Sequence, residues 1–234
     1  MPHLPTLVDI SQKDIYVPYG IKTETEANMN RKDLLLAEKI IEEIRGHRTS
    51  SMLIFNTNFT QIGKTNLILL KGFLDIEKDS GLFVVLDRPH QYMSYLLRMH
   101  DVSQENLWFI DAVTHTSGLE RKKSDNVNFL EGPFHIERLI DTIEFHGDDP
   151  TGGFLPIEKV DFFIMDNIAT ILNYNNMDKV EEFIKSMCKF HEKHPHILGC
   201  VTIDKESNPE LNEVLIEYFD YMVDIEKIKK EVDV

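Results

Sequence analysis

The stretch NFTQIGKTN, from Asn58 to Asn66, has the residue types of a phosphate-binding loop. The usual pattern is G-x-x-x-x-G-K-[ST], and only its opening glycine is replaced here, by an asparagine. In that pattern Gly63 lets a phosphate approach the backbone, Lys64 reaches the β- and γ-phosphates, and Thr65 ligates Mg²⁺. The alternative is an ordinary helix N-terminus with an exposed lysine, and these residues alone leave both interpretations open.

The replaced glycine is compatible with a tight turn, because asparagine is among the few other residues that adopt positive φ. We therefore predict that the whole stretch contacts a nucleotide. Its members are Asn58, Phe59, Thr60, Gln61, Ile62, Gly63, Lys64, Thr65 and Asn66.

Two further sets of charged residues follow apolar runs. Asp166 ends the run VDFFIM and could hold the Mg²⁺ that Thr65 ligates. Asp87 and Arg88 end the run GLFVVL, where a carboxylate can orient water and an arginine can pair with phosphate. The alternatives are an aspartate that caps the next segment and turn chemistry before Pro89.

These residues need a scaffold that brings distant loops together, and the hydrophobic pattern predicts one. Short apolar runs alternate with helical patterns and do not alternate residue by residue, which is typical of a parallel sheet covered on both faces. The fold class is therefore α/β, with three layers and a mostly parallel sheet flanked by helices. Strands are expected at 51–57, 81–87, 107–113, 127–132, 160–167, 197–203 and 221–226, and helices at 31–47, 65–80, 89–100, 133–146, 176–194 and 209–219.

We expect one domain over residues 31–234, preceded by an extended lead-in over residues 1–30. The last strand is expected to continue into a charged tail. In parallel sheets the carboxyl ends of the strands meet at one edge, so the loops after residues 57, 87 and 167 can form a common site.

Composition excludes several classes of function. The 234 residues carry a net charge of −15, which argues against binding nucleic acid. No apolar run is long enough for a membrane span and no secretory signal is evident, so a cytoplasmic location is expected. Cys188 and Cys200 are isolated and read as reduced core thiols. The histidines in HEKHPH (His191, His194 and His196) lack acidic partners at ligand spacing and read as a solvated helix end.

The succession SMLIFNTNFTQIGKTNLILLKGFL, GLFVVLDRPHQYMSYLLRMHDVSQENLWFIDAV, VNFLEGPFHIERLIDTIE and VDFFIMDNIATILNYNNMDKVEEFIKSM resembles RecA-superfamily ATPases of the KaiC-like branch, from about residue 51 to about residue 226. The resemblance implies a P-loop NTPase fold, ATP and Mg²⁺ as cofactors, and a site that can lie between subunits of a ring or dimer. The chain departs from the family in three places. The glycine-rich segment that normally precedes the first strand is missing, and LLLAEKIIEEIRGHRTS stands in its place. Asn58 replaces the opening glycine, and Asp87 and Arg88 stand where the family has a glutamate pair that activates water.

Three functions follow as hypotheses. The first is an Mg-ATP-binding protein with weak or regulatory ATPase activity, in which Asp87 positions water. The second is a non-catalytic signalling or scaffold module that acts through protein contacts. The third, a DNA-binding accessory of the recombinase type, is disfavoured by the acidic charge.

Overall fold

The sequence folds around one seven-stranded sheet, seen here in a computed structural model that describes residues 29–48, 51–116, 118, 126–132, 136–144 and 157–232. The strands are β1 (Met52–Asn56), β2 (Gly81–Val85), β3 (Leu107–Asp111), β4 (Val127–Phe129), β5 (Phe162–Met165), β6 (Leu198–Ile203) and β7 (Tyr221–Asp224). The helices are α1 (Arg31–Ile44), α2 (Ile62–Lys71), α3 (His90–Met99), α4 (Glu137–Glu144), α5 (Met177–Lys193), α6 (Pro209–Tyr218) and α7 (Ile225–Val232).

The order of the strands in the sheet is β4-β3-β2-β5-β6-β1-β7, and every pair of neighbours is parallel. The carboxyl ends of all seven strands therefore lie at one edge. Strand β6 separates β1 from β5, whereas β2 lies directly beside β5. The predicted α/β class with a parallel sheet is confirmed.

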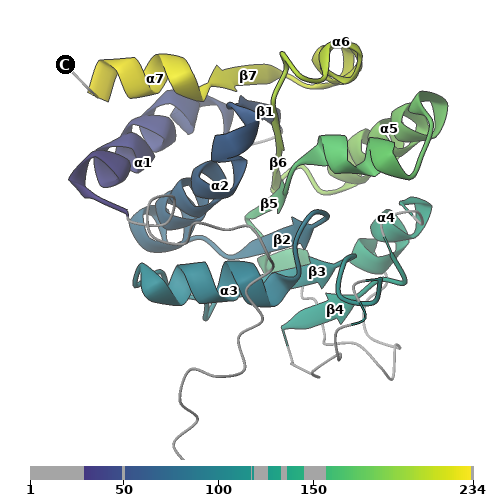
Figure 1. The fold of residues 1–234 in the computed structure, drawn as a ribbon, viewed down its shortest axis with the longest axis horizontal. Helices are drawn as coiled ribbons and strands as arrows, with labels where there is room; N and C mark the ends of the chain where they lie inside the picture. Colours follow the sequence, from purple (N-terminus) through teal and green to yellow (C-terminus); the bar gives the residue numbers. More distant parts are fainter. Residues whose placement is uncertain are drawn as a thin grey trace, which may run out of the picture.

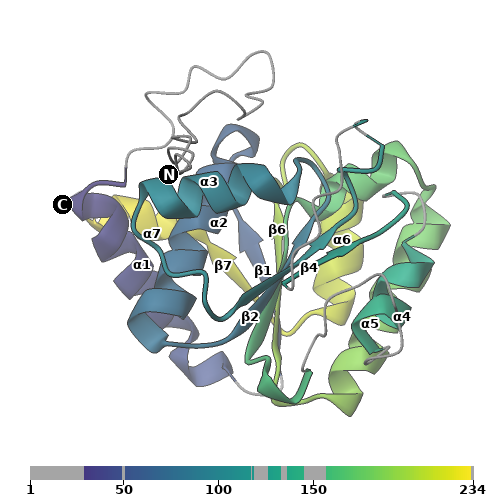
Figure 2. The same cartoon turned by 90° about the horizontal axis from the view of Figure 1, so that it is seen from below.

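Helices cover both faces of the sheet and make three layers (Figures 1 and 2). Helices α1, α2, α3 and α7 cover one face, and their apolar residues share a core with Leu53, Phe83 and Ile164 of the sheet. Helices α4, α5 and α6 cover the other face, where Ile54, Val84 and other strand residues make a second core. Burial on both faces explains why the strands read as continuous apolar runs.

Four local features differ from the sequence-based prediction. Helix α2 begins at Ile62, three residues before the expected Thr65, and it continues into a π-helical turn over Gly72–Glu77. The expected charged tail is the helix α7, whose first turn is capped by the carboxylate of Asp224. The helix end around His191 is not fully solvated, because that side chain is buried.

Of the predicted lead-in over residues 1–30, residues 1–28 lie outside the described residues. Within the described ranges, every helix is too short or too polar to traverse a lipid bilayer.

Candidate functional site

Aspartates line the carboxyl edge of the sheet, at or just after five of its strands. They are Asp87, Asp111, Asp166, Asp204 and Asp224. Each could be a functional carboxylate or a cap for the loop that follows, and their hydrogen bonds separate the two cases.

Three of these aspartates hold their own loops. Asp111 is fully buried and accepts hydrogen bonds from the backbone of His90, Val113 and Thr114, from the Thr114 hydroxyl and from His90 Nδ1, the last at 2.6 Å. Asp204 accepts from two backbone N–H groups and one hydroxyl in its own loop. Asp224 caps α7 and pairs with Lys205. These carboxylates have structural roles.

Asp87 and Asp166 are different, and they follow the neighbouring strands β2 and β5. Asp166 is buried, and among the described residues its side chain accepts one hydrogen bond, from Nδ2 of Asn66 to Oδ1 at 2.6 Å. Asp87 is partly exposed, and its Oδ2 lies 3.7 Å from Nε of Arg88. Neither carboxylate is held by backbone N–H groups in the way that Asp111 is.

The environment of Asp166 favours its protonated form. Burial, together with the nearby charge of Asp87, raises the pKa of Asp166 to about 7, although Arg88 and the hydrogen bond from Asn66 act in the opposite direction. Hydrogen bonds instead lower the pKa of Asp111 by more than its burial raises it. A buried carboxylate with a raised pKa in a cluster of charges is a marker of a functional site.

Arg88 connects this pair of carboxylates to the N-terminus of α2. Its guanidinium carbon lies 4.8 Å from the centre of the Tyr92 ring, which is a cation–π contact. A Cβ atom placed on Gly63 would lie 3.8 Å from Nη1 of Arg88, so that glycine leaves the guanidinium close to the helix backbone. A cation, two carboxylates and a helix N-terminus therefore meet at one place.

The N–H groups of residues 59–62 all have acceptors within the chain, three of them in the loop itself. Phe59–Gln61 forms a short 3₁₀ turn. The N–H of Phe59 donates to Asp204, that of Thr60 to the Asn58 side chain, that of Gln61 to the Asn58 carbonyl and that of Ile62 to the Phe59 carbonyl. Asn58 itself has φ −62° and ψ 140°, so the positive φ considered for it is not adopted.

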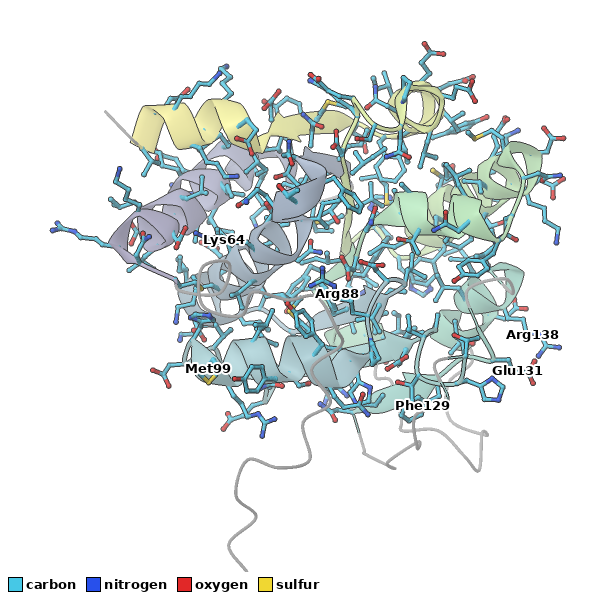
Figure 3. The ribbon with its side chains drawn as sticks, in the orientation of Figure 1. Lys64, Arg88, Met99, Phe129, Glu131 and Arg138 are labelled. Atoms are coloured by element: carbon cyan, nitrogen blue, oxygen red, sulfur yellow. The ribbon has the colours of Figure 1, made fainter. Side chains whose placement is uncertain are left out.

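Two residues of the G-K-T triplet have partners other than Asp87 and Asp166. Nζ of Lys64 lies 2.8 Å from Oδ1 of Asp33 in α1. The buried hydroxyl of Thr65 lies 3.0 Å from the hydroxyl of Thr57, which follows β1. Figure 3 shows Lys64 beside α1 and Arg88 nearer the middle of the molecule.

The rotation of α2 about its axis explains this arrangement. Successive helix residues are separated by about 100°, so residues three apart share a face. Gly63 and Asn66 share the face toward Arg88 and Asp166, and Lys64 and Thr65 then project elsewhere. The structure brings Asp87 and Asp166 together with Gly63 and Asn66, and it does not bring Lys64 to them.

Asn66 also has an unused acceptor. Its side chain is fully buried, and Oδ1 has no hydrogen-bond partner among the described residues. Carboxylate and amide oxygens with water suit Mg²⁺, which is commonly bound through one or two carboxylates together with substrate phosphates. Asp87, Asp166 and Asn66 therefore fit such an ion, although the described residues contain no group of three histidine, cysteine or acidic side chains able to hold a metal alone.

Sequence reasoning missed two carboxylates in this region, Asp204, which accepts the N–H of Phe59, and Asp33, which pairs with Lys64. Asp204 could have been found by the argument that placed Asp166 at the sheet edge, because it too follows a buried strand. Asp33 left no comparable signal, since an acidic residue in the first turn of a helix is common. Its contact with Lys64 depends on how α1 packs on α2.

Comparisons with known proteins support the fold and go no further. No protein-family model and no curated protein matches the chain. A similar solved structure is the uncharacterized protein PH0321 from Pyrococcus horikoshii in complex with an unknown peptide, with a TM-score of 0.52, 12% identity, and coverage of 79% of this chain and 81% of that chain. The DUF1998 helicase MrfA has a TM-score of 0.43 and 11% identity, and the match covers 84% of this chain and 30% of the helicase. The first likeness shows an α/β fold alone, and the second carries no argument.

Proposed function

We propose that this chain is an Mg-ATP-binding domain of the RecA/KaiC-like kind with weak or regulatory ATPase activity. One observation carries the proposal. A buried carboxylate whose pKa is raised to about 7, Asp166, lies with Asp87 and Arg88 at the N-terminus of α2. Asp111, Asp204 and Asp224 lie at the same sheet edge, and their hydrogen bonds explain them as caps of loops or helices. The hydrogen bonds of Asp87 and Asp166 give them no such capping role among the described residues.

The chemistry of the group fits a metal–phosphate ligand. Asp166 would hold the ion directly or through water, and Oδ1 of Asn66 would accept a hydrogen bond from a water of the ion. A bound cation would also favour the ionised form of Asp166 and remove the repulsion between Asp166 and Asp87. The N-terminus of α2 favours negative charge and would face the phosphates.

Asp87 is the candidate catalytic residue. It is solvent-accessible and close to the buried carboxylate, so it can orient a water molecule against a phosphate. Arg88 pairs weakly with Asp87 at 3.7 Å and would compete with that role. This arrangement supports slow turnover and a regulatory function.

A second candidate is the non-catalytic signalling or scaffold module, alone or as a homo-oligomer. The observation that favours it is the closed loop, because the N–H groups of residues 59–62 already have acceptors within the chain. A phosphate would have to displace those bonds, which costs binding free energy. In this case the residues at the carboxyl edge of the sheet bind no nucleotide, and the protein acts through contacts of its surface with other proteins.

Titration of Mg-ATP against thermal stability separates the two candidates. A ligand present at 100 times its Kd stabilises a protein by about 2.7 kcal/mol, so binding predicts a clear rise in Tm. We expect the rise to be lost in Asp166→Ala and kept in Asp224→Asn, which alters a structural aspartate at the same edge. If the Tm of the wild-type protein does not rise at Mg-ATP concentrations up to the millimolar range, the nucleotide-binding function is excluded and the scaffold function remains.

If binding is found, the rate of phosphate release tests turnover. We expect a slow rate in the wild-type protein and a lower rate in Asp87→Asn, with Mg-ATP affinity retained. An unchanged rate in Asp87→Asn would show that this residue does not position water.

A further inference from the structure

The cation that a phosphate-binding loop provides is normally its lysine, but Lys64 has another partner here. Nζ of Lys64 lies 2.8 Å from Asp33 Oδ1, and Asp33 is buried, with an exposed fraction of 6%. The other oxygen of Asp33 accepts the backbone N–H of Asn30 and completes the capping box of α1. Releasing Lys64 would leave a buried carboxylate without its charge partner, which is costly.

Arg88 is in the opposite situation. Its contact with Asp87 is 3.7 Å, longer than a hydrogen bond, and about two-fifths of its side chain is exposed. The cation–π contact with Tyr92 is at 4.8 Å from the ring centre, and no hydrogen bond joins the guanidinium to the other described residues, so its N–H groups are available for a ligand. Replacing the weak contact with Asp87 by a phosphate therefore costs little.

The position of Arg88 also suits a phosphate. Its Nη1 lies next to Gly63 at the second residue of α2, where a side chain on residue 63 would come within 3.8 Å of it. One turn along the same face, the buried and unpartnered Oδ1 of Asn66 adjoins Asp166, so a site for the metal lies beside the site for the anion. Lys64 lies on a different face of the helix.

We propose that Arg88, in place of Lys64, is the side chain that binds the phosphate of the Mg-nucleotide, and that Lys64 has the structural role of joining α2 to α1. This inference rests on the proposed function. The planar guanidinium can donate two parallel hydrogen bonds to one phosphate. The side chain that binds the phosphate is thus in the loop after β2, and not in α2, which follows β1.

Two matched sets of variants test the assignment, with Kd for Mg-ATP and for Mg-pyrophosphate measured by calorimetry. Arg88→Ala removes the proposed phosphate ligand, and Arg88→Lys keeps the charge without the planar fork. The double variant Lys64→Met/Asp33→Asn removes both members of the buried pair, so that no uncompensated carboxylate remains. Thermal unfolding of each variant shows that it is folded.

We expect Arg88→Ala to raise both Kd values roughly ten- to hundredfold, the range for a hydrogen bond to a charged group. Arg88→Lys should lie between wild type and Arg88→Ala. The double variant should stay within about threefold of wild type.

The reverse pattern overturns the inference: Mg-ATP binding that survives Arg88→Ala but is lost in the folded double variant would identify Lys64 as the ligand. Equal losses in both sets would also contradict it. A wild-type protein that binds neither Mg-ATP nor Mg-pyrophosphate would overturn the proposed function as well, so the two failures are distinguishable.

Discussion

At the scale of single residues, the same side chain has opposite behaviour at two positions of one sheet edge. Asp111 receives five hydrogen bonds, and these lower its pKa in spite of its burial. Among the described residues, Asp166 receives one side-chain hydrogen bond; it lies near Asp87, and its pKa is raised to about 7. Both carboxylates are buried, so the difference lies in the hydrogen-bond donors around Asp111 and in the charge of Asp87 near Asp166.

Asp166 should therefore destabilise the fold at neutral and basic pH. Its folded-state pKa of about 7 exceeds the ordinary value of 3.8, so the folded protein binds more protons than the unfolded chain between these pH values, and stability falls as pH rises through that window. We expect Asp166→Asn to raise the free energy of unfolding at pH 8 by one to several kcal/mol, since each pKa unit corresponds to about 1.4 kcal/mol. The gain should shrink toward pH 4.

Urea denaturation at pH 4, 6 and 8 measures this effect, and Asp111→Asn provides the control. Because hydrogen bonds lower the pKa of Asp111, its contribution is present above the ordinary pKa and is lost as pH falls through the folded one. Asp111→Asn should therefore lower stability at pH 8. A pH-independent effect of Asp166→Asn would contradict the raised pKa.

At the scale of elements, the rotation of α2 decides what the loop can do. The sequence predicted the parallel sheet, the strand that precedes Asp166 and the edge at which Asp87 and Asp166 meet. These predictions succeeded because apolar runs and the helical patterns between them are visible in short stretches of the sequence. It did not predict which face of α2 Lys64 occupies. One residue corresponds to about 100° of rotation, and the packing of α1 on α2 sets that angle.

The pair of Lys64 and Asp33 should be a measurable link between α1 and α2. We expect Lys64→Ala to lower the free energy of unfolding by about 2 kcal/mol, because it leaves a buried carboxylate unpaired. Lys185→Ala removes an exposed ion pair with Glu181 in α5 and should cost much less, because solvent screens that pair.

A double-mutant cycle with Asp33→Asn isolates the link from other effects of each change. We expect a coupling free energy of about 1 kcal/mol or more between the two sites. Additive effects would show that Lys64 does not depend on Asp33 for its position, and the lysine would then be free to reach a ligand.

At the scale of the whole molecule, charge determines which form of a nucleotide the site can accept. The chain has a net charge of −15, and two carboxylates without backbone caps lie beside the proposed phosphate position. One guanidinium does not offset this field for a free polyphosphate. A divalent cation would reduce the charge of the ligand and bridge it to Asp87 and Asp166.

Binding should therefore require the metal. We expect ATP in the presence of EDTA to bind at least about tenfold more weakly than Mg-ATP, because the carboxylates then repel the phosphates without a bridging ion. Titrations of Mg-ATP and of ATP with EDTA at 50 and 200 mM salt measure both Kd values. The ratio of the two Kd values should be smaller at the higher salt concentration, because salt screens the repulsion. In Asp87→Asn the difference in affinity between Mg-ATP and ATP with EDTA should be smaller, since one repelling charge is removed. Equal affinities with Mg²⁺ and with EDTA would mean that the phosphates bind away from this edge, where the carboxylates of β2 and β5 have no influence.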